Sequence, residues 1–151
     1  MKLARLNFPT YQFKFKYKEN KTYIFCELRK KFLVLTPEEW VRQNCIKFLM
    51  IEKNYKSTSL NVEKSFTINQ LEKRYDIVSF AKDASIDLVV ECKAPYVKIQ
   101  QSTFDQIARY NLVLKADYLM LTNGIEHYFC QMDHEHQTYH FLRDLPEKTF
   151  R

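Results

Sequence analysis

Three ionisable side chains lie inside two apolar segments near the middle of the chain. The segment "RYDIVSF" (74–80) contains Asp76, and "IDLVVECK" (86–93) contains Glu91 and, two positions later, Lys93. Such segments usually form buried strands, where a charge is costly unless it is paired, hydrated or bound to a metal. Carboxylate oxygens suit Mg²⁺, and a neighbouring lysine can orient water or stabilise a phosphorane-like transition state. These residues are therefore candidates for metal-dependent phosphoryl chemistry.

The strand pattern predicts that these side chains converge. Side chains alternate along a strand, so Asp87, Glu91 and Lys93 are expected to point the same way. The polar turn "AKDAS" (81–85) predicts antiparallel pairing, which brings Asp76 near the Glu91 end. The alternative is an exposed Glu91–Lys93 pair at a strand end with Asp76 on the surface. Spacing alone favours this alternative, because Asp followed by Glu-x-Lys is common by chance.

A helix is predicted immediately before the strands, over "TPEEWVRQNCIKFLMIEK" (36–53). Thr36 is the expected N-cap, Pro37 fits the first turn, and Glu39 completes a capping box. The helix is expected to end near Asn54. Its inward face is predicted to carry Val41, Cys45, Phe48 and Leu49.

The rest of the pattern predicts one strand before the acidic pair, then a helix and further strands after it. The dipeptide Asn123-Gly124 is expected to supply the positive φ angles of a tight primed turn. The inward face of the second helix should contain Phe104, Ile107, Ala108, Asn111 and Leu114. The predicted segments are a strand at 59–68, a helix at 98–116, a hairpin at 117–132 and a last strand at 138–142.

The N-terminal part of the chain is basic and aromatic. Residues 1–36 contain nine basic and two acidic residues, whereas the remainder contains 15 and 16. The alternation in "YQFKFKYK" (11–18) predicts a half-buried strand that forms a hairpin with 22–28, followed by a short strand at 31–35. A basic end indicates an anionic partner, first of all nucleic acid, or simply a solubilising edge. The buried face is predicted to carry Tyr11, Phe13, Phe15 and Tyr17, and the outer face Gln12, Lys14, Lys16 and Lys18.

Composition excludes several classes of protein. Gly124 is the only glycine, so the chain has neither a P-loop ATP site nor a dinucleotide-binding fingerprint. No apolar run approaches the ~18 residues of a membrane span. The four cysteines form no CxxC pair and are interpreted as reduced core residues of a cytoplasmic protein. The histidines of "DHEHQTYH" (133–140) are interpreted as a solvated loop rather than a zinc or nickel site, and His127 as structural.

An ordered set of residues carries a resemblance to a known family. The set is Glu38, Asp76, Glu91-Cys92-Lys93 and Gln106-x-x-x-Tyr110, within "RKKFLVLTPEEWVRQ", "VECKAP", "QIARYN" and "LTNG". The sequence resembles the N-terminal nuclease domain of the R (motor) subunit of type I restriction enzymes, in the PD-(D/E)XK superfamily, over about residues 31–132. Tyr75 stands where the nominal motif has proline, and the helicase motor is absent from this chain.

The resemblance implies an α/β, restriction-endonuclease-like three-layer core, with a central mixed sheet, flanking helices and the order αβββαβ. It implies one nuclease-like domain over residues 1–151. Its parts are a basic hairpin at 11–35, a core at 36–132, and a C-terminal strand and tail at 133–151.

The resemblance also implies a Mg²⁺-dependent DNA endonuclease, with Mn²⁺ as a substitute metal. Asp76, Glu91 and the main-chain carbonyl of Cys92 would bind the metal, while Lys93 positions the attacking water. Glu38, or Glu39 in its place, would support the metal's water shell, and Gln106 and Tyr110 would orient Lys93 or a phosphate. A DNA-binding module without catalysis is the alternative. Expected partners are DNA and either a second copy or other restriction–modification subunits, with no membrane. The DNA contacts are assigned to Lys14, Lys16, Lys18, Lys30, Lys31 and Arg109.

Overall fold

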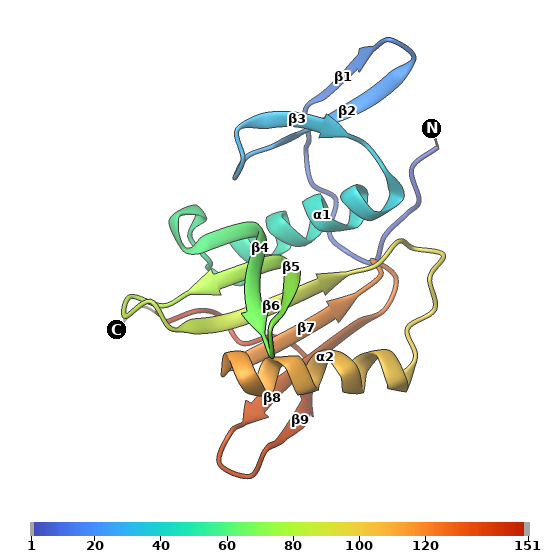
Figure 1. Ribbon diagram of the computed structural model, residues 1–151. Coiled ribbons are helices and arrows are strands. Elements are labelled where there is room, and N and C mark those ends of the chain that lie inside the picture. Colours follow the sequence, from blue (N-terminus) through green and yellow to red (C-terminus); the bar gives the residue numbers. More distant parts are fainter. Residues whose placement is uncertain (1, 150–151) are drawn as a thin grey trace.

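Two sheets and two long helices make up the described part of the computed structural model, which is residues 2–149 (Figure 1). A small N-terminal sheet has the strand order β1-β2-β3, and a larger sheet has the order β4-β5-β6-β7-β8-β9. The N-terminal strands and first helix are β1 (Phe15–Lys18), β2 (Lys21–Cys26), β3 (Lys31–Val34) and α1 (Pro37–Glu52). The later elements are η1 (Ser57–Ser59), β4 (Leu60–Ile68), β5 (Leu71–Phe80), β6 (Ile86–Cys92), α2 (Gln101–Leu114), β7 (Tyr118–Thr122), β8 (His127–Asp133) and β9 (Thr138–Leu142).

The larger sheet is mixed, as predicted. Strands β6 and β7 are parallel and are joined through α2, while every other neighbouring pair in the sheet is antiparallel. The order of one helix, three strands, a second helix and further strands confirms the sequence-based prediction of a mixed α/β fold. Strand β9 confirms the predicted last strand at 138–142.

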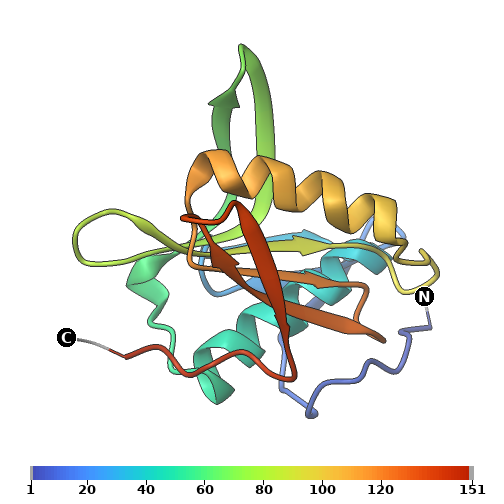
Figure 2. The same cartoon turned by 90° about the horizontal axis from the view of Figure 1, so that it is seen from below.

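The two helices cover opposite faces of the larger sheet (Figures 1 and 2). This follows from the strand period of two, since alternate residues of β6 contribute to different apolar clusters. The cluster under α1 includes Val41, Cys45, Leu49, Ile77, Leu88 and Val90. The cluster under α2 includes Phe104, Ile107, Ala108, Val78, Val89 and Leu119.

The start of α1 was predicted in part. The hydroxyl of Thr36 accepts a hydrogen bond from the Glu39 backbone N–H at 3.0 Å, and Pro37 is the first helical residue. The Glu39 carboxylate, however, accepts hydrogen bonds from the side chains of Arg29, Arg42 and Gln43. The predicted capping box is therefore wrong in its second half, because charged donors bind a carboxylate more strongly than a neutral N–H does.

The predicted primed turn at Asn123-Gly124 is also wrong. Gly124 has φ +86°, but Asn123 does not have a positive φ, and its side-chain oxygen accepts hydrogen bonds from the backbone of Ile125 and Glu126. The connection is thus a four-residue Asx-type loop. Pairs of positive φ angles occur instead at Glu19-Asn20 and Asn69-Gln70, the turns of the β1–β2 and β4–β5 hairpins.

The N-terminal strand is shorter and more exposed than predicted. Residues 11–14 precede β1, and Phe15 and Tyr17 are 47% and 70% exposed, so the expected aromatic face is not fully buried. The reason is that β1 is an edge strand of a small sheet that projects from the body (Figure 1). The aromatic run reaches the body at Trp40, whose ring centroid lies 5.1 Å from that of Phe13 and 6.4 Å from that of Phe15.

The C-terminal residues that follow β9 pack on the body within the described range. Leu145 is 1% exposed in the cluster under α1, and the Lys148 backbone N–H donates to the Lys53 carbonyl at 2.8 Å. The predicted tail is therefore partly a packed segment; Phe150 and Arg151 lie outside the described residues. All four cysteines are buried and free, as predicted. No helix within residues 2–149 is long and apolar enough to cross a membrane.

Candidate functional site

Asp76 is fixed at the point where β5, β6 and α1 meet. Its Oδ1 accepts hydrogen bonds from Nη2 and Nε of Arg42, at 2.7 and 3.2 Å. Its Oδ2 accepts the backbone N–H of Cys92 at 2.8 Å. Both carboxylate oxygens therefore have donors, and the guanidinium supplies two of the three hydrogen bonds.

Glu91 has a different environment on the neighbouring strand. The residue is 5% exposed, and its Oε1 has no hydrogen-bond partner among the described residues. The Lys73 ammonium lies 3.6 Å from that oxygen. Burial raises the pKa of Glu91 to about 7, Asp76 adds to the rise, and Lys73 and Lys93 oppose it. The side chain thus carries a buried, incompletely paired oxygen beside a second carboxylate.

Lys93 follows β6 directly and is half-buried. Its backbone N–H donates to the Thr122 carbonyl at 2.8 Å, which continues the β6–β7 pairing past the end of the strand. The Asn123 side chain donates to the Val97 carbonyl at 2.9 Å and so holds the segment that leaves the site. The "LTNG" segment therefore positions the end of β6.

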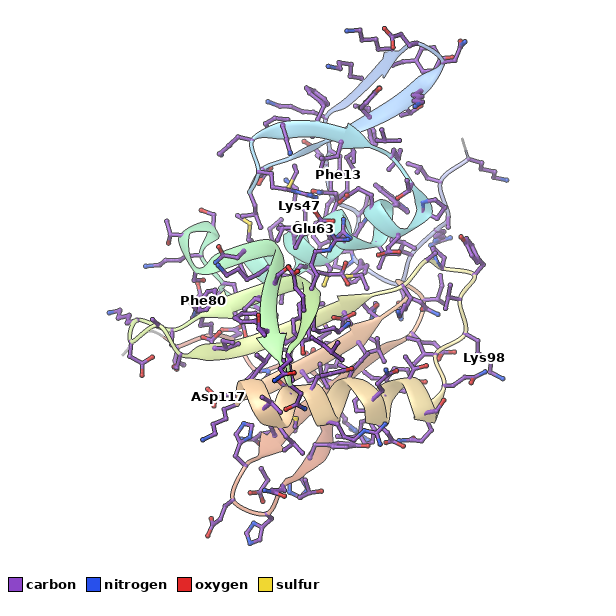
Figure 3. All side chains as sticks on the ribbon, in the orientation of Figure 1. Phe13, Lys47, Glu63, Phe80, Lys98 and Asp117 are labelled. Atoms are coloured by element: carbon purple, nitrogen blue, oxygen red, sulfur yellow. The ribbon has the colours of Figure 1, made fainter. Side chains whose placement is uncertain are left out.

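A network of arginines and acids surrounds Asp76 on the α1 side of the sheet. Arg42 lies 2.7 Å from Glu39 and 3.7 Å from Glu63, and Arg29 lies 3.2 Å from each of the same two acids. Figure 3 shows Glu63 beside α1. Burial lowers the pKa of Arg42, but the neighbouring carboxylates of Asp76 and Glu39 together raise it by more. The net shift of the pKa is upward, so the guanidinium stays charged.

Glu63 has a strained backbone at this position. Its φ is +56°, a region that residues with a Cβ seldom occupy. The β4–β5 register is interrupted here, since it passes from Val62↔Ile77 to Lys64↔Tyr75 without the pair between them. Strain of this kind often accompanies functional sites. The distant parts of the network, Arg29 and Glu63, had no signal in the sequence.

Glu38 and Glu39 differ in their exposure and in their distance from Arg42. The Glu38 side chain is 50% exposed and reaches Arg42 only at 3.5 Å. The Glu39 side chain is 8% exposed and makes the shorter contact of 2.7 Å with the same arginine. Both acids border the network, but Glu39 is the one that is held within it.

The predicted pair Gln106 and Tyr110 lines one cleft, and Tyr110 also lies near Lys73. Lys73 lies 6.0 Å from the Tyr110 ring and 5.2 Å from the Tyr75 ring, which links Tyr110 to the surroundings of Glu91. Burial, then Glu91 and Tyr110, raise the pKa of Tyr75, so its hydroxyl stays protonated. Gln106 is exposed and, with Arg109 and Tyr110, lines a shallow cleft of about 260 Å³ against the β4–β5 turn. The sequence did not single out Lys73 and Tyr75 as site residues. Their spacing of two along one strand is nevertheless a signal, because it predicts that both side chains lie on the same face.

The donor set fits a hard cation with water ligands better than a fully protein-bound metal. No group of three or more His, Cys, Asp or Glu side chains suited to a metal occurs within residues 2–149. Asp76 and Glu91 are two carboxylates, and Glu91 offers an oxygen that lacks a hydrogen bond. Mg²⁺ characteristically binds through one or two carboxylates and keeps several waters. The residues present therefore suit Mg²⁺.

Comparisons with known proteins identify the family. The family model described as "Type I restriction enzyme R protein N terminus (HSDR_N)" matches residues 37–146. The chain belongs to this family. It is similar to the fragment structure of a putative HsdR subunit of a type I restriction enzyme from Vibrio vulnificus YJ016, at 19% identity and a TM-score of 0.48. That match covers 67% of this chain but only 22% of the other chain. No curated protein matches the sequence.

The basic residues assigned to DNA do not form one surface in this R-protein N-terminal chain. Lys14, Lys16 and Lys18 lie along one edge of the small sheet, whereas Arg109 lies on α2, which covers the far face of the larger sheet from α1. Lys30 lines a cavity of about 490 Å³ together with Lys14. The lysines of the small sheet and Arg109 therefore belong to two separate basic surfaces.

The histidines have structural partners. His127 bonds the Thr122 hydroxyl at 2.7 Å and the Asn7 carbonyl at 2.6 Å, in line with the structural role expected of it. His134 bonds the Ala116 carbonyl at 2.7 Å, and His136 bonds Asp133 at 2.9 Å.

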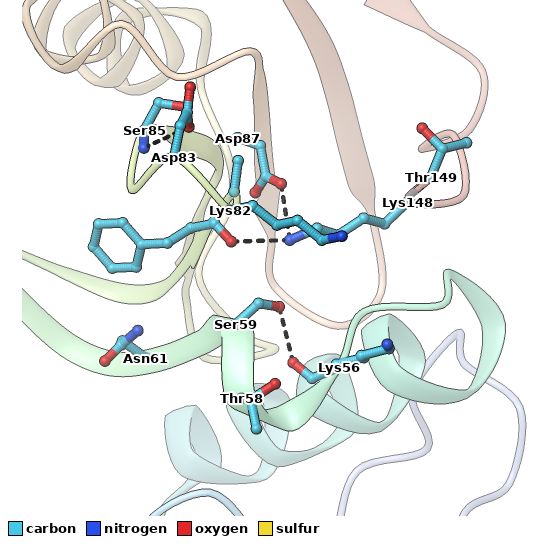
Figure 4. A pocket seen from close by; sticks show the side chains of 12 residues that line it. Lys56, Thr58, Ser59, Asn61, Lys82, Asp83, Ser85, Asp87, Lys148 and Thr149 are labelled. Carbon is cyan, nitrogen blue, oxygen red and sulfur yellow. Dashed lines mark hydrogen bonds and ion pairs between the residues drawn. The ribbon is translucent and has the colours of Figure 1, made fainter. Parts of the chain in front are cut away.

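A larger cavity of about 680 Å³ lies near the start of β6 (Figure 4), and Glu91 is not among the residues that line it. Lys148 crosses it and contacts Asp87 at 2.9 Å and the Phe80 carbonyl at 3.0 Å. Although Asp87 was expected to share a face with Glu91, it is engaged by this lysine at the other end of the strand. The cavity is therefore separate from the candidate metal site.

Proposed function

We propose that this chain is a Mg²⁺-dependent DNA endonuclease of the PD-(D/E)XK type, which hydrolyses phosphodiester bonds. The observation that carries the proposal is the pairing of Asp76 with Glu91, whose buried oxygen lacks a hydrogen bond, at the strand end that leads into Lys93. Membership of a restriction-enzyme R-protein family supports the same class of reaction. The helix–sheet–helix layers support the restriction-endonuclease-like core.

The residues have distinct roles in this proposal. Asp76, Glu91 and the main-chain carbonyl of Cys92 would hold Mg²⁺, which would supply Lewis acidity and favour ionisation of a water at the site. Lys93 orients the attacking water and stabilises the negative charge that develops on the phosphate. Arg42 holds the Asp76 side chain in place through its hydrogen bonds.

The supporting residues act around that centre. Glu39 holds Arg42, and the exposed Glu38 is available to the metal's water shell. Tyr110 stands beside Lys73, and Gln106 lines the neighbouring cleft, where a phosphate of the substrate can be oriented. The lysines of the small sheet contact further phosphates. A second copy of the chain, or other restriction–modification subunits, would bring a second site to the opposite strand of a duplex.

A non-catalytic DNA-binding subunit is the second candidate function. The observation that favours it is that both oxygens of Asp76 already accept hydrogen bonds from the protein. In that case Arg42 would replace the cation permanently, and the chain would use only its basic surfaces. Metal binding distinguishes the two functions, because a binding module has no need of Mg²⁺.

Cleavage of supercoiled plasmid tests the proposal. The wild-type chain with Mg²⁺ or Mn²⁺ should nick the plasmid, and a chelator should abolish the reaction. Asp76→Asn and Glu91→Gln should each remove activity, since either change removes an anionic ligand. Asp144→Asn is the matched control: this carboxylate is 62% exposed, pairs with Lys53 and lies outside the site, so activity should persist. Nicking by both site variants at the wild-type rate would overturn the proposal.

A further inference from the structure

The small N-terminal sheet has two chemically different faces. One face packs on the body: Ile24 and Cys26 of β2 are fully buried, and the Phe13 ring lies against Trp40. Because side chains alternate along each strand, the residues between them point to the opposite, outer face. That outer face is formed by Lys16 and Lys18 of β1, Lys21, Tyr23 and Phe25 of β2, Phe32 and Val34 of β3, and Lys14 beside β1.

Three aromatic rings lie together on the outer face. Phe25 is paired directly with Phe32, and their ring centroids are 5.2 Å apart at an interplanar angle of 58°. Tyr23 lies two positions before Phe25 on the same strand. None of the three is fully buried. The rings therefore make a partly open aromatic surface rather than the centre of a core.

Lysine ammonium groups lie over these rings. Lys16 Nζ is 4.7 Å from the centroid of Phe32 and 5.6 Å from that of Tyr23, and Lys14 Nζ is 5.7 Å from that of Phe25. Cation–π contacts at exposed sites are weak, so the lysines can leave the rings when a better partner arrives.

The sheet is also strongly positive. Lys18 is paired with Lys21 at the hairpin end, which extends the row begun by Lys14 and Lys16. No residue of β1, β2 or β3 is acidic. The nearby Glu27 is neutralised by an ion pair with Lys47. Glu19, in the β1–β2 turn between Lys18 and Lys21, offsets part of this charge, so the face combines a net positive charge with partly open aromatic rings.

We propose that this outer face binds single-stranded nucleic acid, with bases stacked on Tyr23, Phe25 and Phe32 and phosphates bound by the lysines. Aromatic platforms with a positively charged border bind single strands without reading sequence, because every base has a flat face. A base stacks on a ring more strongly than an exposed ammonium does, so the lysines are released to the phosphates. A duplex fits poorly, because its bases are already stacked on one another.

The inference rests on the proposed function for its nucleic-acid partner. It adds that the preferred substrate carries an unpaired segment beside the bond to be cut. Its test measures binding and not cleavage. The chain carrying Asp76→Asn and Glu91→Gln is used in parallel, since it should bind single strands as the wild type does. Loss of nuclease activity and loss of the platform are thereby observed separately.

Fluorescence anisotropy with a labelled oligothymidylate, long enough to cross the sheet, and with a duplex of equal length tests the platform. Wild type should bind the single strand more tightly than the duplex. The variant Tyr23→Leu/Phe32→Leu keeps apolar side chains but lacks two rings, and its Kd for the single strand should rise by about tenfold or more. Its duplex affinity and its thermal unfolding curve should stay close to wild type.

Lys16→Gln separates the charge from the rings. Its single-strand affinity should fall less steeply with salt, by roughly 0.7 in the log–log slope for one lost phosphate contact. Tighter binding of duplex by the wild type would overturn the platform. So would an unchanged single-strand Kd in the folded double-leucine variant, because the surface would then act through its lysines alone.

Discussion

The guanidinium of Arg42 donates to a single oxygen of Asp76 from two nitrogens, Nη2 at 2.7 Å and Nε at 3.2 Å. The same side chain donates to Glu39 from Nη1 at 2.7 Å. One buried cation therefore joins the first turn of α1 to the strand that carries a candidate metal ligand. The Asp76 carboxylate is therefore fixed in position by the protein itself, and a metal site needs preorganisation of this kind.

Replacing Arg42 by alanine should destabilise the protein by roughly 3–5 kcal/mol. The change removes the charged partner of Asp76 and one of the two charged partners of Glu39, whose side chains are 11% and 8% exposed. Chemical denaturation measured by circular dichroism gives the free energy of unfolding. Arg42→Lys, which keeps the charge but has fewer donors, should lose clearly less. Equal stability of Arg42→Ala and wild type would mean that the network has no structural role.

The two neighbouring glutamates of α1 should respond differently to the same substitution. Glu39→Ala removes a buried acceptor shared by Arg29, Arg42 and Gln43 and should cost about 2–4 kcal/mol. Glu38→Ala removes a half-exposed acid at 3.5 Å and should cost less than about 1 kcal/mol. The free energies of unfolding of these adjacent variants, measured side by side, decide which acid belongs to the network. A reversed order would contradict the assignment.

Glu91 should make stability depend on pH. Because its pKa is raised from the ordinary value of 4.5 to about 7 in the folded chain, the folded protein keeps a proton that the unfolded chain loses in this interval. Stability should therefore fall as pH rises from about 4.5 to about 7, by at most about 1.4 kcal/mol per pH unit. Glu91→Gln cannot titrate, so the difference between the two unfolding curves isolates this group. Parallel curves would show that Glu91 has an ordinary pKa.

Metal affinity should show the opposite trend with pH. A cation needs the ionised carboxylate, so Mn²⁺ affinity should increase as pH rises toward about 7 and then level off. Calorimetric titrations below and above that pH measure the effect. An affinity that stays constant across this range would mean that Glu91 does not ligate the metal.

Lys93→Ala should separate catalysis from metal binding. The ammonium is proposed to orient water and stabilise developing charge, so plasmid nicking should fall by roughly 10²–10³-fold. Mn²⁺ affinity should not decrease, since Lys93 is not a ligand and its charge opposes a cation. Lys98→Ala, on the nearby loop, is the control and should keep activity. Full metal-dependent cleavage by Lys93→Ala would remove the role proposed for this lysine.

Features that depend on local sequence were predictable. The N-cap Thr36, the helical position of Pro37 and the antiparallel pairing of the two acidic segments all follow from signals within a few residues. The proximity of Asp76 to Glu91 followed from that pairing together with the strand period of two. The mixed sheet followed from the order of the elements.

Features that depend on distant contacts were not predictable. Arg29 and Glu63 meet across 34 residues of sequence, and no periodic pattern connects them. The loop at 123–126 differs from a primed turn because the Asn123 side chain accepts two backbone hydrogen bonds. The exposure of Phe15 and Tyr17 arises because the small sheet projects from the body, which alternation within one strand cannot reveal.

Isothermal titration with Mn²⁺ distinguishes a metal site from a set of ion pairs, with wild type and the Asp76→Ala/Glu91→Ala variant compared under the same conditions. We expect wild type to bind the ion and nick plasmid, and the variant to do neither while still unfolding cooperatively. If the folded wild-type chain does not bind Mn²⁺, the proposed metal site is wrong. Asp76 and Glu91 would then serve only the ion pairs with Arg42 and Lys73.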